Sequence, residues 1–187
     1  GTPQELFCMN ELCKSFSLER VGKSGAKFDF DKTRWFNQQY LRAKSKEDLA
    51  KDLQVILKEN GVEADDNFVA TVCEQLKERA TFVKDMWEEG KYYFVAPTSY
   101  DEKTIRKKWK EDTPNLLSEF KNRIEEILDF SSDNIEKEFK SYLEEKELGM
   151  GKLLPAFRVS LTGLGMGPSL FDIAFLLGKE ETIKRIE

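Results

Sequence analysis

The sequence predicts an all-α protein made of two compact helical halves, and three observations favour this prediction. Apolar residues recur at intervals of three and four along most of the 187-residue chain, as expected for helices with one buried face. Asp, Ser or Pro precedes most of these stretches and Gly follows several of them, which is the usual chemistry of helix ends. No period of about 20 to 50 residues repeats, so a solenoid is disfavoured. The length suits one domain or two small ones, and we favour two.

The first half is expected to hold five helices. Ser45 and Asp48 resemble a capping box at the start of the third helix, with Asp in place of the usual Glu or Gln. In the second helix the aromatic residues gather on one side and are expected in the core. The chain is predicted to begin with a helix at Glu5–Phe16, a break at Gly22–Gly25 and an extended segment at Lys27–Phe30. The second helix is capped by Asp31 and carries Trp35, Phe36, Tyr40 and Leu41. The remaining helices are predicted from Ser45 to Gly61, at Asn67–Thr81 and, shorter, at Phe82–Glu89.

The second half begins after an aromatic segment, Lys91–Pro97, that is expected to be extended. Pro97-Thr98-Ser99 is a natural boundary between the halves. Helices are then predicted at Asp101–Glu111, Pro114–Leu128, Ser132–Glu147 and Lys152–Leu161, followed by one that Pro168 opens and Gly178 closes.

The composition excludes several classes of protein. No apolar run approaches the roughly 20 residues of a membrane helix. The absence of histidine removes Ser-His-Asp and Cys-His nucleophiles and the usual His-containing zinc sites. Cys8, Cys13 and Cys73 form no C-x-x-C pair, and their odd number favours a reducing cytoplasm over a disulfide framework. Gly1-Thr2-Pro3 lacks an initiator methionine and a secretory pattern, so we expect a boundary inside a longer protein.

The net charge of −5 disfavours a nucleic-acid binder, but the charge is unevenly distributed. The stretch Ile124–Glu147 is rich in Glu, whereas cations crowd the first quarter at Arg20, Lys23, Lys27, Lys32, Arg34, Arg42, Lys44 and Lys46. An acidic protein can therefore still carry one basic face.

A glycine-rich turn between Phe157 and Phe171 is the most distinctive motif. Alternating glycines allow positive φ and a close approach of a ligand to the backbone, and Arg158 lies one helix upstream. The same spacing also fits a plain helix-loop-helix turn. The turn lacks the lysine and hydroxyl of a phosphate-binding P-loop, and we predict no catalytic residue and no metal site in this chain.

A second candidate site is a basic cluster around Trp109. It comprises Lys103, Arg106, Lys107, Lys108 and Lys110. Cations interleaved with an aromatic ring suit a single nucleic-acid strand, with phosphates on the cations and a base on the ring. The alternative is a solvated helix face with Trp109 in the core.

Two segments together resemble bacterial glutamyl-tRNA synthetases. Ser17–Val21 with Phe28–Lys32 and Trp35–Arg42 is similar to the family's F-D motif and W-x-N-x-x-Y-[IL]-R helix. Arg158–Phe171, followed by Leu176-Leu177-Gly178-Lys179-Glu180 and Arg185, is similar to its last motif, R-x-x-[LI]-T-G ending in P-x-L-F and L-L-G-K-E. The stretch Asn60–Leu148 matches only in helical character.

The resemblance implies an all-α region of the class I synthetase anticodon-binding type, with three parts. Residues 1–27 would end the stem-contact region with a short helical remnant, residues 28–97 would form the first anticodon-binding subdomain and residues 98–187 the second. The family's bundles grip the anticodon loop of tRNA. By position, Arg158 and the turn through Gly167, Pro168 and Leu170 would read anticodon bases, the last with its side chain, although Gly167 stands where many relatives carry Thr.

The resemblance implies tRNA(Glu) as the partner. It also implies a monomeric cytoplasmic protein that binds neither DNA nor a membrane. We expect Lys103, Arg106, Lys107 and Arg42 to contact the tRNA backbone. ATP, with Mg, would bind a catalytic domain outside this chain, and the chain itself would need no cofactor. The rival hypothesis is a helical protein-interaction module without RNA binding, favoured by the acidic pI near 5.1.

Overall fold

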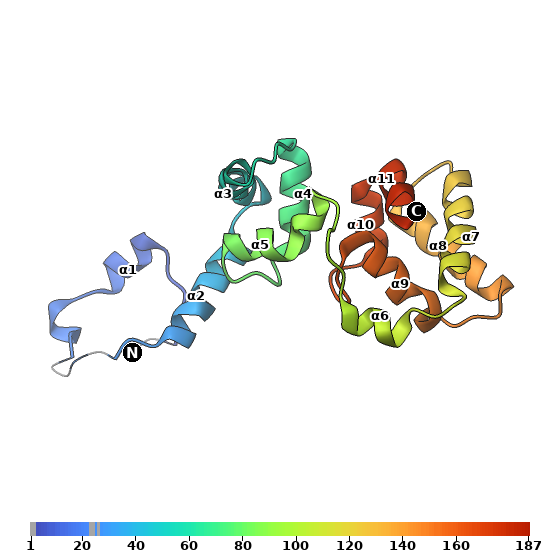
Figure 1. The fold of residues 1–187 in the computed structure, drawn as a ribbon. Helices are drawn as coiled ribbons and strands as arrows, with labels where there is room; N and C mark the ends of the chain where they lie inside the picture. Colours follow the sequence, from blue (N-terminus) through green and yellow to red (C-terminus); the bar gives the residue numbers. More distant parts are fainter. Residues whose placement is uncertain (1–2, 23–24, 26) are drawn as a thin grey trace.

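The computed structural model describes residues 3–22, 25 and 27–187, and it confirms the predicted all-α class. In this part of the chain all the regular structure is α-helix or 3-10 helix. The helices form an N-terminal arm and two bundles that follow one another in a row (Figure 1). No helix of the described residues is long and apolar enough to cross a membrane.

The N-terminal arm consists of α1 (Met9–Ser15), a 3-10 turn η1 (Leu18–Arg20) and the longer α2 (Phe30–Ala43). Asp29, and not the predicted Asp31, caps α2, since its carboxylate accepts a hydrogen bond from the backbone N–H of Lys32 at 2.9 Å. The predicted break at Gly22–Gly25 lies partly outside the described residues.

The aromatic residues of α2 are not in the core, contrary to the prediction. Phe30 is 76% exposed, Trp35 39% and Tyr40 47%. Most of α2 projects from the first bundle, and only Leu41 near its C-terminal end is buried there. The predicted Glu5–Phe16 helix is likewise shorter than expected and buries none of its residues.

The first bundle contains α3 (Lys46–Glu59), α4 (Asp66–Leu76) and α5 (Val83–Gly90), ending in the 3-10 helix η2 (Lys91–Tyr93). Ser45 caps α3 as predicted, and Gly61 adopts φ +71° after its end. The core is mostly aliphatic, with Leu49, Leu53, Leu57, Val69, Val72, Leu76 and Met86 fully or almost fully buried.

The segment after α5 is helical where an extended strand was expected. The backbone N–H groups of Phe94 and Val95 both bond to the carbonyl of Lys91, at 3.0 and 2.9 Å. Tyr92 and Tyr93 are consecutive and both buried, which an alternating strand does not allow. The chain therefore continues from α5 in one tighter turn.

The second bundle contains α6 (Glu102–Lys108), α7 (Thr113–Glu126), α8 (Ser132–Glu145), α9 (Met150–Thr162), α10 (Leu170–Leu177) and α11 (Lys179–Ile186). Its core is aromatic. Phe120 contacts the rings of Phe139, Tyr142 and Phe157 at centroid distances of 4.9, 5.8 and 5.3 Å.

Two ends in the second bundle differ from the prediction. Ser169 caps α10, so Pro168 precedes the helix instead of opening it. The sequence analysis also missed α11, which follows α10 without a loop because Gly178, at φ +82°, ends one helix and begins the next.

The two bundles share a packed junction. Ile173 of α10 is buried in the first core, and Leu177 packs against both cores. Arg185 of α11 donates from Nη1 to the carbonyls of Tyr92 and Leu161, both at 2.7 Å. These contacts fix η2 of the first bundle against α9 of the second.

Candidate nucleic-acid interface

The turn between α9 and α10 closes over Arg158. Nη2 of this arginine donates to the Pro168 carbonyl at 2.9 Å. A Cβ atom on Gly167 would lie 3.1 Å from Nη1 of Arg158, and 3.9 Å from the Tyr92 hydroxyl. The side chain predicted to read bases and the turn predicted to present its backbone are therefore in direct contact.

Two further glycines hold this turn against the start of the second bundle. Gly163 ends α9 at φ +73°, and a Cβ there would collide with the Ser99 carbonyl. A Cβ on Gly165 would collide with the side chains of Asp101 and Thr104. Close packing within the protein explains these two positions, whereas Gly167 borders a charged group that has unused hydrogen-bonding capacity.

Three polar atoms meet at this junction without a hydrogen-bond partner in the described residues. They are Nη1 of Arg158 and the hydroxyls of Tyr92 and Tyr93. The two hydroxyls approach each other, and the rings lie 4.6 Å apart between centroids, but no hydrogen bond of acceptable geometry joins them. A buried polar group without a hydrogen-bond partner destabilises a protein by about 1 to 3 kcal/mol. A ligand that supplied partners to these three atoms would therefore gain affinity.

Burial sets the electrostatics of the cluster. It lowers the pKa of the Arg158 guanidinium, which lies near Arg79, and raises the pKa of both tyrosines. A partly desolvated guanidinium interacts strongly with an acceptor or a π face, since little water is left to compete with either.

Leu170 is buried in this structure. Its side chain is only 2% exposed and packs in the second core, at the first position of α10. A base contact by this side chain stays a prediction, as it does for Arg158, Gly167 and Pro168.

The predicted backbone-contact residues on α6 lie exposed on the helix that adjoins the turn. Lys103 and Lys107 form no ion pair with any residue that the structure describes, whereas Arg106 pairs with Glu102 at 3.6 Å. Gly165 of the turn lies against Asp101 and Thr104, at the start of the same helix.

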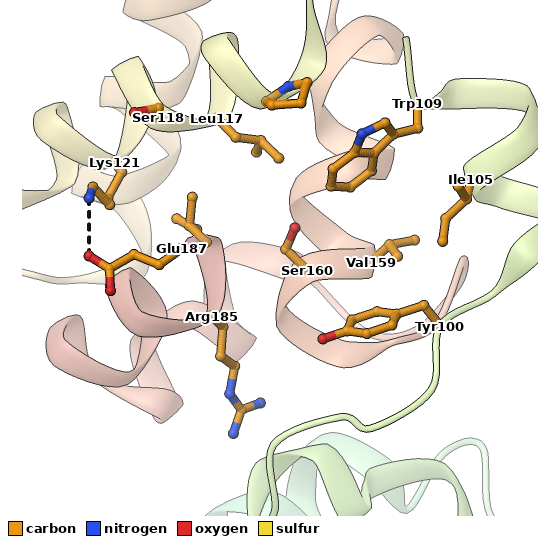
Figure 2. Close-up of a pocket in the computed structure, with 12 residues that line it drawn as sticks. Tyr100, Ile105, Trp109, Leu117, Ser118, Lys121, Val159, Ser160, Arg185 and Glu187 are labelled. Atoms are coloured by element: carbon orange, nitrogen blue, oxygen red, sulfur yellow. Dashed lines mark hydrogen bonds and ion pairs between the residues drawn. The ribbon is translucent and has the colours of Figure 1, made fainter. Parts of the chain in front are cut away.

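Trp109 follows α6 and is half-buried against the second core. This position is nearer to the alternative prediction, in which Trp109 packs in the core, than to a ring exposed for a base. Figure 2 shows its ring and that of Tyr100 on two sides of a cavity of about 520 Å³. Val159 and Ser160 of α9 line the same cavity, and an ion pair of 3.1 Å between Lys121 and Glu187 lies at its edge. This cavity opens on another face of α9 from Arg158, and the structure does not bring Trp109 into the Arg158 cluster.

Arg42 and Asn37 of α2 are engaged within the protein. Arg42 donates from Nη2 to the Glu78 carbonyl at 2.5 Å, and its Nε lies 3.2 Å from the Glu78 carboxylate. Asn37 donates to the Thr81 carbonyl. Both side chains tie α2 to the loop between α4 and α5, which leaves Arg42 less free than the lysines of α6 for a phosphate.

Sequence reasoning missed three residues of this interface. Tyr92 and Tyr93 were assigned to an extended segment, and Arg185 was noted only as part of a motif. A pair of adjacent tyrosines just before a Pro-containing linker was the available signal. Their position under Arg158 depends on the hydrogen bond from Arg185 to the Tyr92 carbonyl, between residues 93 positions apart in the sequence. The spacing of apolar residues gives no information on such a contact.

Comparison with known proteins identifies the kind of region. A family described as "Anticodon binding domain" matches residues 38–187. A glutamate–tRNA ligase from Phocaeicola vulgatus is 48% identical over 186 residues, and one from Flavobacterium johnsoniae is 47% identical over 187 residues. The chain is covered completely in both comparisons but spans 37% of the length of each relative.

Solved structures agree with this result. A glutamate tRNA ligase from Elizabethkingia meningosepticum, solved in complex with its amino acid, superposes with a TM-score of 0.92 at 42% identity. The glutamate–tRNA synthetase of Elizabethkingia anophelis gives a TM-score of 0.87 at 40% identity. Each comparison covers 98% of this chain and 36% of the other, so these similarities concern one part of a larger enzyme.

Proposed function

The chain belongs to the family of anticodon-binding domains, and from this premise we propose that it recognises the anticodon loop of a glutamate tRNA. It would do so as the non-catalytic part of a glutamate–tRNA ligase, which attaches glutamate to tRNA(Glu) with ATP. The observation that carries the proposal is the buried Nη1 of Arg158 beneath the Gly167–Pro168 turn, which has no hydrogen-bond partner in the part of the chain that the structure describes.

The chemistry of the junction suits unstacked bases. Proteins read RNA mainly where bases are splayed out, by stacking on aromatic or guanidinium planes and by hydrogen bonds to base edges. Arg158 offers both a plane and a free donor, and the backbone of the glycine turn allows close approach. Lys103, Arg106 and Lys107 on the adjoining helix would hold the phosphates, with Arg42 as a more remote contact.

The rest of the parent protein would supply the reaction. ATP and Mg²⁺ would bind in the catalytic part outside this chain, and we place the enzyme in the cytoplasm as a monomer that binds neither DNA nor membrane. The relatives named glutamate–tRNA ligase support the assignment of the reaction. The role of this chain would be to select the tRNA whose acceptor end is charged elsewhere.

The test is a titration of the 187-residue chain with two fluorescent transcripts at about 50 mM salt, where phosphate contacts are least screened. One transcript is the glutamate tRNA and the other carries a replaced anticodon. We expect at least tenfold tighter binding to the native transcript, because each well-paired base contact contributes about 1 to 3 kcal/mol. Equal affinities would reduce the role to nonspecific electrostatic binding, and no salt-dependent binding would favour the protein-interaction module.

A further inference from the structure

We propose that Tyr92 and Tyr93 are specificity-determining residues of this interface, and that their hydroxyls act with Nη1 of Arg158 to bind the edge of one unstacked nucleobase. The inference rests on the proposed function, since it assumes that an anticodon loop reaches the junction. It adds two residues from the first bundle to a site otherwise built from the second.

The burial of the two hydroxyls is the first argument. Tyr92 is 2% exposed and Tyr93 4%, yet neither hydroxyl has a hydrogen-bond partner in the described residues. Tyr142, buried to the same degree in the second core, has two acceptors for its single O–H, the Glu119 carboxylate at 3.0 Å and the Leu116 carbonyl at 3.2 Å. Buried tyrosines normally satisfy their hydroxyls in this way, so the unpaired couple at the junction calls for a partner outside the chain.

The tyrosine pair is held rigidly in place, as a recognition element must be. Arg185 donates from Nη1 to the Tyr92 carbonyl and to the Leu161 carbonyl, and its Nε pairs with Glu181 at 2.7 Å. On the other side of η2, Gly90 packs so closely on Leu76 that a Cβ would collide with the leucine side chain. The backbone that carries both rings is thus fixed before any ligand arrives.

The turn at residues 165–168, which covers the cluster of Arg158, Tyr92 and Tyr93, makes few polar contacts. Residues 165–167 make no backbone hydrogen bond among the described residues, and the Arg158–Pro168 bond of 2.9 Å is the polar contact that closes the turn onto the arginine. Met166 is 83% exposed, so a displacement of residues 166–168 would uncover no core side chain of the turn itself. A small movement here would admit the edge of a base.

The donor and acceptor set favours the edge of a nucleobase with a carbonyl group over a phosphate. Nη1 can only donate, whereas each hydroxyl can donate or accept. A carbonyl oxygen beside a ring nitrogen suits this set whether the nitrogen is protonated, as in uracil, or not, as in cytosine. A phosphate would have to give up its hydration and bring its full negative charge into a nearly closed site, which is unfavourable even with Arg158 and the nearby Arg79 present.

The experiment compares Tyr92→Phe, Tyr93→Phe and the double variant with the unaltered chain, against the native and the anticodon-replaced glutamate tRNA. Phenylalanine keeps the ring and the packing and removes only the hydroxyl. We expect each variant to lose about three- to tenfold affinity for the native transcript, as for one hydrogen bond, and little for the replaced one. The urea midpoint should stay the same or rise, because an unpaired buried hydroxyl has been removed.

Tyr142→Phe is the matched control, since its hydroxyl has partners within the chain. It should lower the urea midpoint and leave both affinities unchanged. Unchanged binding in the Tyr92 and Tyr93 variants, an equal loss for both transcripts, or a lowered urea midpoint would overturn the inference. If the unaltered chain itself does not discriminate between the transcripts, the proposed function fails; if it discriminates and the variants do so equally, only this inference fails.

Discussion

The buried polar groups in the core of the second bundle differ in their hydrogen bonding from those at the junction between the two bundles. In the core, Thr113 accepts a hydrogen bond from the Lys110 N–H at 2.8 Å, Thr182 donates to the Ala174 carbonyl at 3.2 Å, and the Tyr142 hydroxyl has two partners. At the junction, Arg158, Tyr92 and Tyr93 each have an atom without a hydrogen-bond partner among the described residues. The buried polar groups of the core are thus satisfied within the chain, whereas those of the junction are not.

The contrast separates stability from recognition within one small chain. Substitutions in the core should change the free energy of unfolding and leave anticodon discrimination intact. Substitutions at the junction should change discrimination more than stability, except where a residue holds the two bundles together. The following predictions test this division, and the greatest loss of stability comes first.

Phe120→Ala should give the largest loss of stability. The ring is fully buried and contacts three other aromatic rings, so its removal should lower the free energy of unfolding by about 3 to 5 kcal/mol. Urea unfolding measures this loss. Under conditions where the variant is still folded, the ratio of affinities for the two transcripts should be unchanged, and a changed ratio would remove the distinction between core and junction.

Arg185→Gln should affect both properties, because this residue joins the bundles. Its side chain is 5% exposed and bonds to two carbonyls and Glu181. We expect the free energy of unfolding to fall by about 2 to 3 kcal/mol, with weaker anticodon discrimination as η2 loosens. Lys184→Gln is the control, because that side chain is 77% exposed and pairs with Glu181 only at 4.0 Å. Equal results for the two variants would show that Arg185 does not hold the junction.

Gly163→Ala should strain the start of the recognition turn. The residue has φ +73° and no space for a Cβ beside the Ser99 carbonyl, so a loss of about 1 to 3 kcal/mol in unfolding free energy is expected. Gly151→Ala, in the first turn of α9 with open space around it, should instead leave stability unchanged or raise it by up to about 1 kcal/mol. A result of the same sign for both glycines would argue against a special backbone at Gly163.

Lys103→Gln and Lys107→Gln should have the smallest effect and act alike on both transcripts. Each substitution should reduce the slope of log affinity against log salt by about 0.7, the value for one phosphate contact on a single strand. Lys140→Gln on α8, whose lysine pairs with Glu136 at 2.7 Å, serves as the control. Lysine variants that alter only the native transcript would indicate base contacts on α6.

The sequence was informative where local rules decide the structure. Ser45 and Gly61 marked the ends of α3 correctly, because caps and positive φ depend on neighbouring residues. The apolar spacing of the second half likewise predicted α6 to α10 to within a few residues, although it did not predict α11. The turn and Arg158 were found as one motif because both lie within a short stretch of chain.

Sequence reasoning failed where the partner of a residue is distant or lies outside the chain. The apolar face of α2 was assigned to the core, but periodicity shows only that a face is apolar and not what covers it. Tyr92 and Tyr93 meet Arg158 through the packing of two bundles. Only the structure shows that the side chain of Leu170 lies in the core.

Arg158→Met is the decisive variant for anticodon recognition, because methionine keeps an apolar stem and removes every donor. The measurement is the affinity of this variant for the native and the anticodon-replaced glutamate tRNA at about 50 mM salt. We predict a loss of about 10- to 100-fold for the native transcript, with the weaker binding to the replaced transcript almost unchanged. An unaltered preference for the native anticodon would contradict the account, since Arg158 would then lie outside the site that reads the bases.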